Sequence, residues 1–451
     1  MRKTKDTMFY RSIAAIAFPI TIQSLITIGV NMMDTIMLGQ LGEVAISASG
    51  LANQFIHIFH ILCMGMGMGA SVMTARYWGC HDIASIKKVL AIMYRLAGVF
   101  ILVFTLSSAL FPAAVMGMYT PDETVISEGG SYLLWSLPTY LLLAGSLTTT
   151  IILRSVGEVR VPLYSSIAGF FVNIFFNWVF IFGHLGAPRM GVAGAALGTT
   201  LARLTEFIII AGYFLFRDQR IRFRLQDLFG DTNGVLREYL KISFPVLISD
   251  GLMAFGNSVI SMIMGRIGTS FVSANAITMV TVQLSTVFIQ SLSHAGCIIT
   301  GQTLGAGDKE AAQQQGFKFL RIGLLVGLAG GVIITLISDP VISLYKVTPE
   351  TIDITRELMR SVALIVVFQS ANSVLTKGVL RGGGDTRYLM IVDVIFIWVA
   401  SIPLGYLSGL VWHMDPFWIY FFLKIDNIIK LFICCYRLRS GKWIKRIKQF
   451  A

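Results

Sequence analysis

The second half of this chain repeats the first, and this internal repeat constrains the fold more than any other feature. The pair Phe18-Pro19 recurs as Phe244-Pro245, and the segment LRSVGEVR at 153–160 recurs as LRGGGDTR at 380–387. Further markers recur as Gly39, Gly42, Gly79 and Asp82 in the first half and Gly265, Gly268, Gly305 and Asp308 in the second. A chain of 451 residues duplicated in this way is expected to form two similar lobes.

Both halves are too apolar for a water-soluble protein. Hydrophobic residues make up 55% of the chain and charged residues only 13%, which lies outside the range of ordinary globular domains. A membrane span needs about 20 mostly apolar residues, and twelve such stretches occur, at 13–38, 46–74, 90–115, 131–153, 161–183, 191–216, 240–264, 272–300, 319–345, 358–380, 388–410 and 415–436. We therefore predict an all-α membrane protein with twelve transmembrane helices in two six-helix lobes. Because each lobe has an even number of spans, a pseudo-two-fold axis along the membrane normal relates them.

Domain boundaries follow from the repeat and from the polar stretches between spans. We predict an N-lobe at 1–216, a cytoplasmic inter-lobe linker at 217–239, a C-lobe at 240–436 and a basic cytoplasmic tail at 437–451. Duplicated membrane chains usually handle their substrate where the two repeats meet. Transport is therefore the leading functional hypothesis.

The formal net charge of +12 reports orientation rather than a nucleic-acid partner. Lysine and arginine cluster at the N-terminus, in the linker and in the tail, whereas the opposite loops hold only Arg189, Arg266, Lys346, Arg356 and Arg360. This positive-inside bias places both termini in the cytoplasm and predicts a multi-pass protein of the cell (inner) membrane.

Acidic residues inside the spans are functional candidates, because a carboxylate at the centre of an inserted helix costs roughly 2.5–3.5 kcal/mol. These acids are Asp34, Glu206, Asp250, Asp393 and Asp426. Glu206 follows Arg203 by three residues and Asp426 precedes Lys430 by four, so each has a cation about one helical turn away. Asp393 lies near the predicted inner end of its span, where headgroups could solvate it.

Asp34 differs because no lysine or arginine lies within two helical turns of it. A buried carboxylate without a cation partner is suited to binding and releasing a proton or a sodium ion. The predicted directions of the spans place Asn173, Asn177 and Thr199 at a similar depth, and together the four residues offer oxygen ligands for a hard cation. The alternative interpretation is that the asparagines and the threonine only join helices by hydrogen bonds.

Two further in-span features suggest roles in substrate handling and movement. Asp250 and Glu206 are candidate substrate-binding acids, although Asp250 could instead bond to Ser249 or to a polar group on a facing helix. Pro19 lies on the same predicted helix as Asp34 and frees a backbone carbonyl. It is either a hinge that responds to the charge of Asp34 or a static kink.

Several of these motifs resemble the multidrug and toxic compound extrusion (MATE) family, in its NorM-like and DinF-like bacterial branches. The resemblance covers nearly the whole chain and rests on Phe-Pro followed by NMMDTIMLG at 31–39, on NIFFNW at 173–178 and on LRGGGDTR at 380–387. It implies two six-helix lobes around a central cavity and export of amphipathic, often cationic compounds against an inward flow of protons or sodium ions. It also places Asp34 at the coupling acid of the N-lobe, with Asn173, Asn177 and Thr199 around it.

The C-lobe departs from the pattern of the NorM branch. That branch carries further acids at two positions where this chain has Met253 and Ser370. Asp250 lies near the first position and could replace its acid, but no residue replaces the second. The resemblance therefore favours coupling in the N-lobe, with the proton as the expected ion and sodium as the alternative.

Two other functions, a lipid flippase and an intramembrane enzyme, fit the sequence less well than transport of drugs. A flippase for lipid-linked saccharides would need several cations at mid-depth to bind a diphosphate, whereas Arg203 and Lys424 each have an acidic neighbour in the sequence. An intramembrane enzyme would need a nucleophile, a metal cluster or paired acids, and the sequence shows none of them. We expect a monomer without a cofactor, whose partners are small amphipathic organic substrates and the lipid bilayer.

Overall fold

The computed structural model describes residues 2–232, 234–343, 345 and 347–445. Helices and connecting turns make up this part of the chain, which contains no β-strand. The chain divides into two compact units. Phe18–Leu240 forms one, and Met1–Ala17 joins Lys241–Lys448 in the other. We call them the first and the second unit. The boundary falls within the first helix, next to Pro19, so the predicted N-lobe and the first unit differ at residues 1–17 and in the linker.

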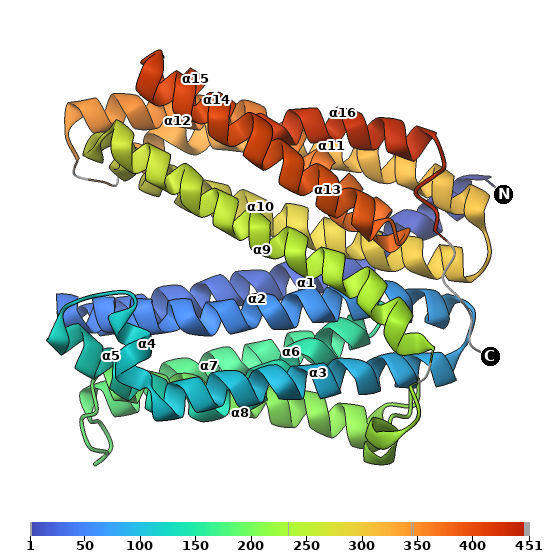
Figure 1. The fold of residues 1–451 in the computed structure, drawn as a ribbon, viewed down its shortest axis with the longest axis horizontal. Helices are drawn as coiled ribbons and strands as arrows, with labels where there is room; N and C mark the ends of the chain where they lie inside the picture. The colour runs from blue at the N-terminus through green and yellow to red at the C-terminus, as the bar shows by residue number, and fades with distance from the viewer. Residues whose placement is uncertain (1, 233, 344, 346, 446–451) are drawn as a thin grey trace. The chain divides into compact units, whose positions relative to one another are not determined.

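The helices of the first half (Figure 1) are α1 (Arg2–Gly39), α2 (Glu43–Gly79), α3 (Ile83–Leu110), α4 (Pro112–Gly117), α5 (Glu123–Trp135), α6 (Leu137–Ser155), α7 (Arg160–Phe182) and α8 (Val192–Gly212). A π-helical turn, η1 (Tyr213–Arg217), extends α8, and the 3-10 turn η2 (Leu225–Phe229) lies in the predicted linker.

The second half begins with α9 (Val235–Ile267), α10 (Thr269–Gly305), α11 (Lys309–Ser343) and α12 (Pro349–Ser373), which continues as the π-helical turn η3 (Val374–Leu380). The remaining elements are α13 (Thr386–Phe396), η4 (Ile397–Ser401), α14 (Ile402–Tyr406), η5 (Leu407–Val411), α15 (Pro416–Leu423) and α16 (Asp426–Arg439).

Eleven helices in the described part are long and apolar enough to cross a membrane. The twelfth predicted span, 415–436, is divided into α15 and α16 by a turn at Lys424 and Ile425. Interrupted helices are common at the binding sites of transporters, because the interruption frees polar backbone groups within the bundle.

The repeat markers have the same structural role in both halves. Gly42 and Gly268 precede α2 and α10 with φ angles of +110° and +159°, which side chains with a Cβ rarely adopt. Asp82 accepts a hydrogen bond from the Ser85 amide at the start of α3, and Asp308 accepts one from the Ala311 amide at the start of α11. The repeated glycines and aspartates therefore terminate and cap equivalent helices.

Small residues allow neighbouring helices within each unit to approach closely. α7 lies beside α8, and α11 lies beside α12 (Figure 1). A Cβ added to Gly194 of α8 would lie 2.5 Å from the Phe180 carbonyl oxygen of α7, and one on Gly331 of α11 would lie 2.5 Å from the Ala363 carbonyl oxygen of α12. Such contacts replace the hydrophobic effect as the packing force between helices in a bilayer.

Candidate functional site

The four residues predicted to surround a coupling ion lie together in the first unit. Asp34 comes from α1, Asn173 and Asn177 from α7, and Thr199 from α8. The Asn177 amide nitrogen donates to Asp34 Oδ1 at 2.5 Å and to Asn173 Oδ1 at 3.3 Å. Asn173 in turn donates to Thr199 Oγ1 at 3.4 Å. Residues more than 130 positions apart thus form one hydrogen-bonded chain.

The local sequence explains how this cluster fits between the helices. Asn173 and Asn177 are four residues apart on α7, which places both on one face, and both are fully buried. A Cβ added to Gly198 of α8 would lie 2.1 Å from Asn177 Oδ1, so only glycine leaves room for this amide. Asn177 Oδ1 itself has no hydrogen-bond partner among the described residues. The site therefore keeps one buried oxygen free to accept a proton donor or a cation.

Asp34 has no ion pair among the residues that the structure describes, since all its side-chain hydrogen bonds there come from neutral groups. Arg203 is present in the same cavity, but it forms its ion pair with Glu206, at 2.8 Å. The pair predicted from the spacing of Arg203 and Glu206 is thus confirmed. Because Arg203 is paired with Glu206, it does not form an ion pair with Asp34.

Asp34 lines an open cavity of about 600 Å³ within the first unit. Polar side chains dominate its wall beside the acid, among them Asn31, Asn53, His57, His60 and Arg203. The sequence gives no sign of this role for the two histidines, because neither has an acidic or cysteine neighbour along the chain. Only the packing of α2 against the other helices brings them to the cavity.

A smaller cavity of about 130 Å³ adjoins the first one. Both are lined by Thr27, His60, Leu143 and Arg203. The smaller cavity also contains Glu206, Gln23 and Arg154, and the Arg154 guanidinium donates to the Gln23 side chain. Polar groups therefore continue from Asp34 toward the end of α6, where Arg154 lies.

The three candidate acids in the spans of the second unit are each bonded to a cation. Asp250 forms an ion pair with Arg381 at 3.3 Å, while Ser249 donates to Asp393 instead. Because Asp250 and Arg381 are far apart in the sequence, this partner could not be recognised from local spacing.

Lys430 forms ion pairs with two buried acids. Its Nζ lies 2.8 Å from Asp426 and 3.3 Å from Asp393. The predicted helix-face pair of Asp426 and Lys430 is confirmed. Asp393 is only 7% exposed, so its solvation comes from Lys430 and Ser249.

The remaining predicted positions have simpler surroundings. Pro19 lies in an uninterrupted stretch of α1, beside the boundary between the two units. Met253 packs against the hydrophobic core of the second unit. Ser370 is fully buried, and its hydroxyl has no hydrogen-bond partner in the described part of the chain.

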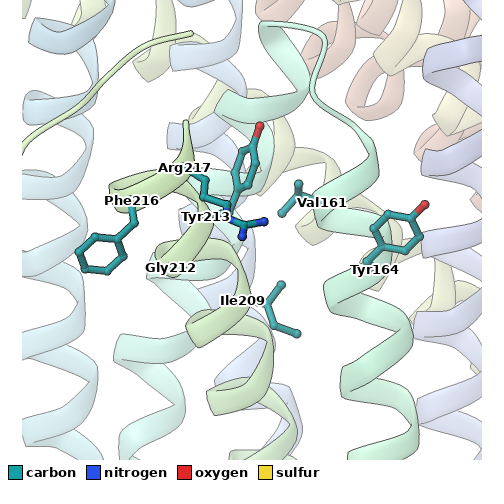
Figure 2. A pocket seen from close by; sticks show the side chains of 7 residues that line it. All are labelled: Val161, Tyr164, Ile209, Gly212, Tyr213, Phe216 and Arg217. Atoms are coloured by element: carbon teal, nitrogen blue, oxygen red, sulfur yellow. The ribbon is translucent and has the colours of Figure 1, made fainter. Parts of the chain in front are cut away.

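One further pocket lies away from all of these residues. Figure 2 shows Val161 and Tyr164 of α7 facing the end of α8, where Tyr213 and Arg217 lie on the following turn. Its volume is about 410 Å³. Its lining contains none of the predicted site residues.

Comparison with known proteins agrees with this architecture. The MatE family model matches residues 19–179 and 245–407, one match in each half. The probable multidrug resistance protein NorM of Thermotoga maritima is 26% identical over 97% of this chain and 93% of its own length. Multidrug resistance protein MdtK of Yersinia pseudotuberculosis is 24% identical over 92% of both chains.

A solved structure of similar fold is described as the outward-facing conformation of a multidrug resistance MATE family transporter. It aligns with a TM-score of 0.87 and 19% identity over 97% of this chain and 96% of its own. The predicted fold class, two lobes built from twelve transmembrane helices, is thereby confirmed.

Proposed function

The chain belongs to the MatE family of multidrug efflux transporters, and we propose that it is a secondary active antiporter. In this proposal it exports amphipathic, cationic compounds from the cell in exchange for protons, or alternatively sodium ions. It spans the inner membrane with both termini in the cytoplasm. The observation that carries the proposal is the bonding of Asp34, whose carboxylate is held by an amide rather than by a cation.

Protonation of Asp34 would reverse the direction of one hydrogen bond. The ionised carboxylate accepts from the Asn177 amide nitrogen, and this fixes the amide with Oδ1 turned away from Asp34. A protonated Asp34 becomes a donor, which favours the opposite orientation of the Asn177 amide. Since Asn177 bonds in turn to Asn173, the protonation state would be transmitted through α7 toward α8.

Exchange follows because a proton and a cationic substrate favour different charge states of the same lobe. The ionised site attracts a cation, whereas the protonated site does not, so each ligand lowers the affinity for the other. Sodium would act in the same way through the carboxylate, the asparagine carbonyls and the Thr199 hydroxyl, which are oxygen ligands.

We further propose Pro19 as the hinge of α1. Proline removes the helical hydrogen bond to the carbonyl four residues earlier, which weakens the helix locally. Pro19 lies next to the boundary between the two compact units, and Asp34 lies farther along the same helix. A change in the bonds of Asp34 would therefore be transmitted to the point where α1 bends most easily.

Asp250 and Glu206 stay predictions as substrate-binding acids. Each is bonded to an arginine, and a cationic substrate would have to replace that partner. We therefore expect their contributions to be smaller than that of Asp34.

Efflux of ethidium from proteoliposomes with an imposed pH gradient or an imposed sodium gradient tests the proposal. We expect the pH gradient to drive efflux and Asp34→Asn to abolish it, because asparagine keeps the shape of the side chain and removes the titratable charge. The matched control is Asp353→Asn, which changes an acid whose side chain is 77% exposed. A response to sodium alone would assign sodium as the coupling ion, and gradient-driven efflux by Asp34→Asn would reject Asp34 as the coupling site.

A further inference from the structure

The second unit contains an open cavity whose charged lining differs from that of the Asp34 cavity. It has a volume of about 640 Å³ and is lined by α9, α10, α12, α15 and the turn that follows α15. Its described lining includes Lys424 and four amide side chains, Asn257, Asn275, Gln283 and Gln369, but no aspartate or glutamate. The cavity of the first unit is lined by Asp34 as well as by Arg203, so the two cavities offer different charges to a ligand.

Lys424 lies in the turn that interrupts the twelfth predicted span. Its Nζ donates to Asn257 Oδ1 at 3.1 Å. An ammonium group has three N–H donors, so this bond leaves two of them for a ligand. No ion pair of Lys424 occurs among the described residues.

The nearest acid in the sequence does not neutralise Lys424. Asp426 forms its ion pair with Lys430 at 2.8 Å and accepts from Ser401 at 2.8 Å. The acidic neighbour of Lys424 in the sequence therefore forms its ion pair with another lysine. This is the pair that the four-residue spacing of Asp426 and Lys430 predicted.

The rest of the cavity suits an amphipathic molecule. Asn275 Oδ1 is buried without a hydrogen-bond partner in the described part of the chain, so this carbonyl can accept from a ligand donor. Met264 and Met279 contribute flexible apolar surface, and Tyr420 adds an aromatic wall. Among the described residues that line the cavity, Lys424 is the only charged one.

We propose that this cavity binds the carboxylate of amphipathic zwitterions, with Lys424 as its counter-ion. The substrate range would then include zwitterionic compounds as well as the cations of the proposed function, on which this assignment rests. The single positive charge of Lys424 neutralises the single negative charge of a carboxylate. A diphosphate carries more charge and needs several cations for binding, so a lipid-linked diphosphate fits this cavity less well.

A matched pair of dyes tests the assignment. Tetramethylrhodamine carries a free carboxylate, and its methyl ester has the same ring system without that charge. Binding of both dyes to the purified full-length protein in detergent is measured by fluorescence anisotropy. The variants are Lys424→Met, Lys424→Arg and, as a control, Lys309→Met, which changes an exposed lysine at the start of α11.

We expect Lys424→Met to weaken binding of the carboxylate dye about tenfold, because a charge-assisted hydrogen bond is lost. Binding of the ester should change less than twofold, and this also shows that the variant is folded. Lys424→Arg should restore most of the affinity for the carboxylate dye, and Lys309→Met should affect neither dye. Equal weakening of both dyes, or no weakening of either, would overturn the assignment.

Two further measurements distinguish a failure of this binding assignment from a failure of the antiport proposal. If gradients drive efflux of the ester but Lys424 does not affect the choice between the dyes, the antiport proposal stands and this assignment fails. If no gradient drives efflux of either dye, yet Lys424→Met weakens only the carboxylate dye, the binding site stands and the antiport proposal fails. Displacement of the dye by farnesyl diphosphate, but not by a carboxylate amphiphile, would overturn the assignment and indicate that the cavity binds a diphosphate lipid.

Discussion

The carboxylates of the two halves differ in how they are neutralised. In the first unit, Asp34 accepts its hydrogen bond from Asn177. In the second, Asp250 pairs with Arg381, and Asp393 and Asp426 share Lys430. Protonation of Asp34 disrupts no ion pair, whereas protonation of Asp250, Asp393 or Asp426 disrupts one. This difference makes the first unit the better place for reversible proton binding, although both halves derive from one repeat.

The same difference predicts that the candidate acids of the second unit contribute mainly to stability, whereas Asp34 contributes mainly to function. Breaking a buried ion pair leaves an uncompensated charge, which is strongly destabilising, so the acids of the second unit are expected to hold their helices in place. Asp34 contributes less to stability, because its partners are neutral and the cavity beside it is open.

The largest expected effect is on stability, at Lys430. Lys430→Met should destabilise the protein by about 3–5 kcal/mol, because two buried acids lose their shared cation. Asp34→Asn should destabilise it by less than about 1 kcal/mol, since one hydrogen bond to a neutral group changes. Thermal unfolding in detergent measures both. A larger loss for Asp34→Asn than for Lys430→Met would reverse the comparison.

The next largest effect is expected at Gly198. Gly198→Ala places a Cβ 2.1 Å from Asn177 Oδ1, so Asn177 must move away from Asp34. We expect at least a tenfold loss of gradient-driven efflux, since a displaced group in a tuned site commonly costs this much or more. The control is Gly212→Ala on the same helix, where an added Cβ meets nothing within 4 Å. Equal efflux by both variants would show that Asn177 is dispensable.

A smaller and selective effect is expected at Asp250. Asp250→Asn should weaken efflux of cationic dyes several-fold more than that of neutral dyes of similar size, if Asp250 contacts substrate. An equal loss for both kinds of dye would indicate that the ion pair with Arg381 is purely structural. Efflux of a matched cationic and neutral pair, compared in the same vesicles, distinguishes the two outcomes.

The smallest effect is expected in the predicted linker, where Asp227 pairs with Lys87 at 2.9 Å. Burial raises the pKa of Asp227, but the Arg224 amide and Lys87 lower it by more, so this pKa lies below its ordinary value of 3.8. The carboxylate therefore stabilises the fold above about pH 4, and this contribution is lost as the pH falls through the lowered pKa.

Because the pair is partly exposed, its contribution should be below about 1 kcal/mol. Asp227→Asn should lower the melting temperature slightly at pH 7, and the difference from the parent chain should shrink as the pH falls below the ordinary pKa of the carboxyl. A difference that stays constant over this range would show that the carboxylate charge does not contribute.

Much of the fold could be predicted because hydrophobicity and repetition are local properties of the sequence. The spans are recognisable from their apolar length, and the repeated glycines and aspartates mark helix ends in both halves. The broken twelfth span was not predicted. The span was predicted from its overall apolar length, which gave no sign of the turn at Lys424 and Ile425.

The candidate site was predictable to the extent that its chemistry is unusual. An acid without a nearby cation identified Asp34, and the spacing on one helix joined Asn173 to Asn177. The cavity lining and the ion pairs of Asp250 with Arg381 and of Asp393 with Lys430 were not predictable, because these partners lie far apart in the chain. Lys424 is a further example, since its hydrogen bond goes to Asn257 on a different helix.

The amino-acid sequence by itself determined that this chain is a duplicated membrane protein whose first half carries an isolated acid. Composition and the repeat suffice for these conclusions, because a bilayer admits few structures for so apolar a chain. The tertiary structure decided which charges are neutralised and which line a cavity. That distinction depends on contacts between distant helices, where a few ångströms decide whether a lysine bonds to an acid or remains available to a ligand.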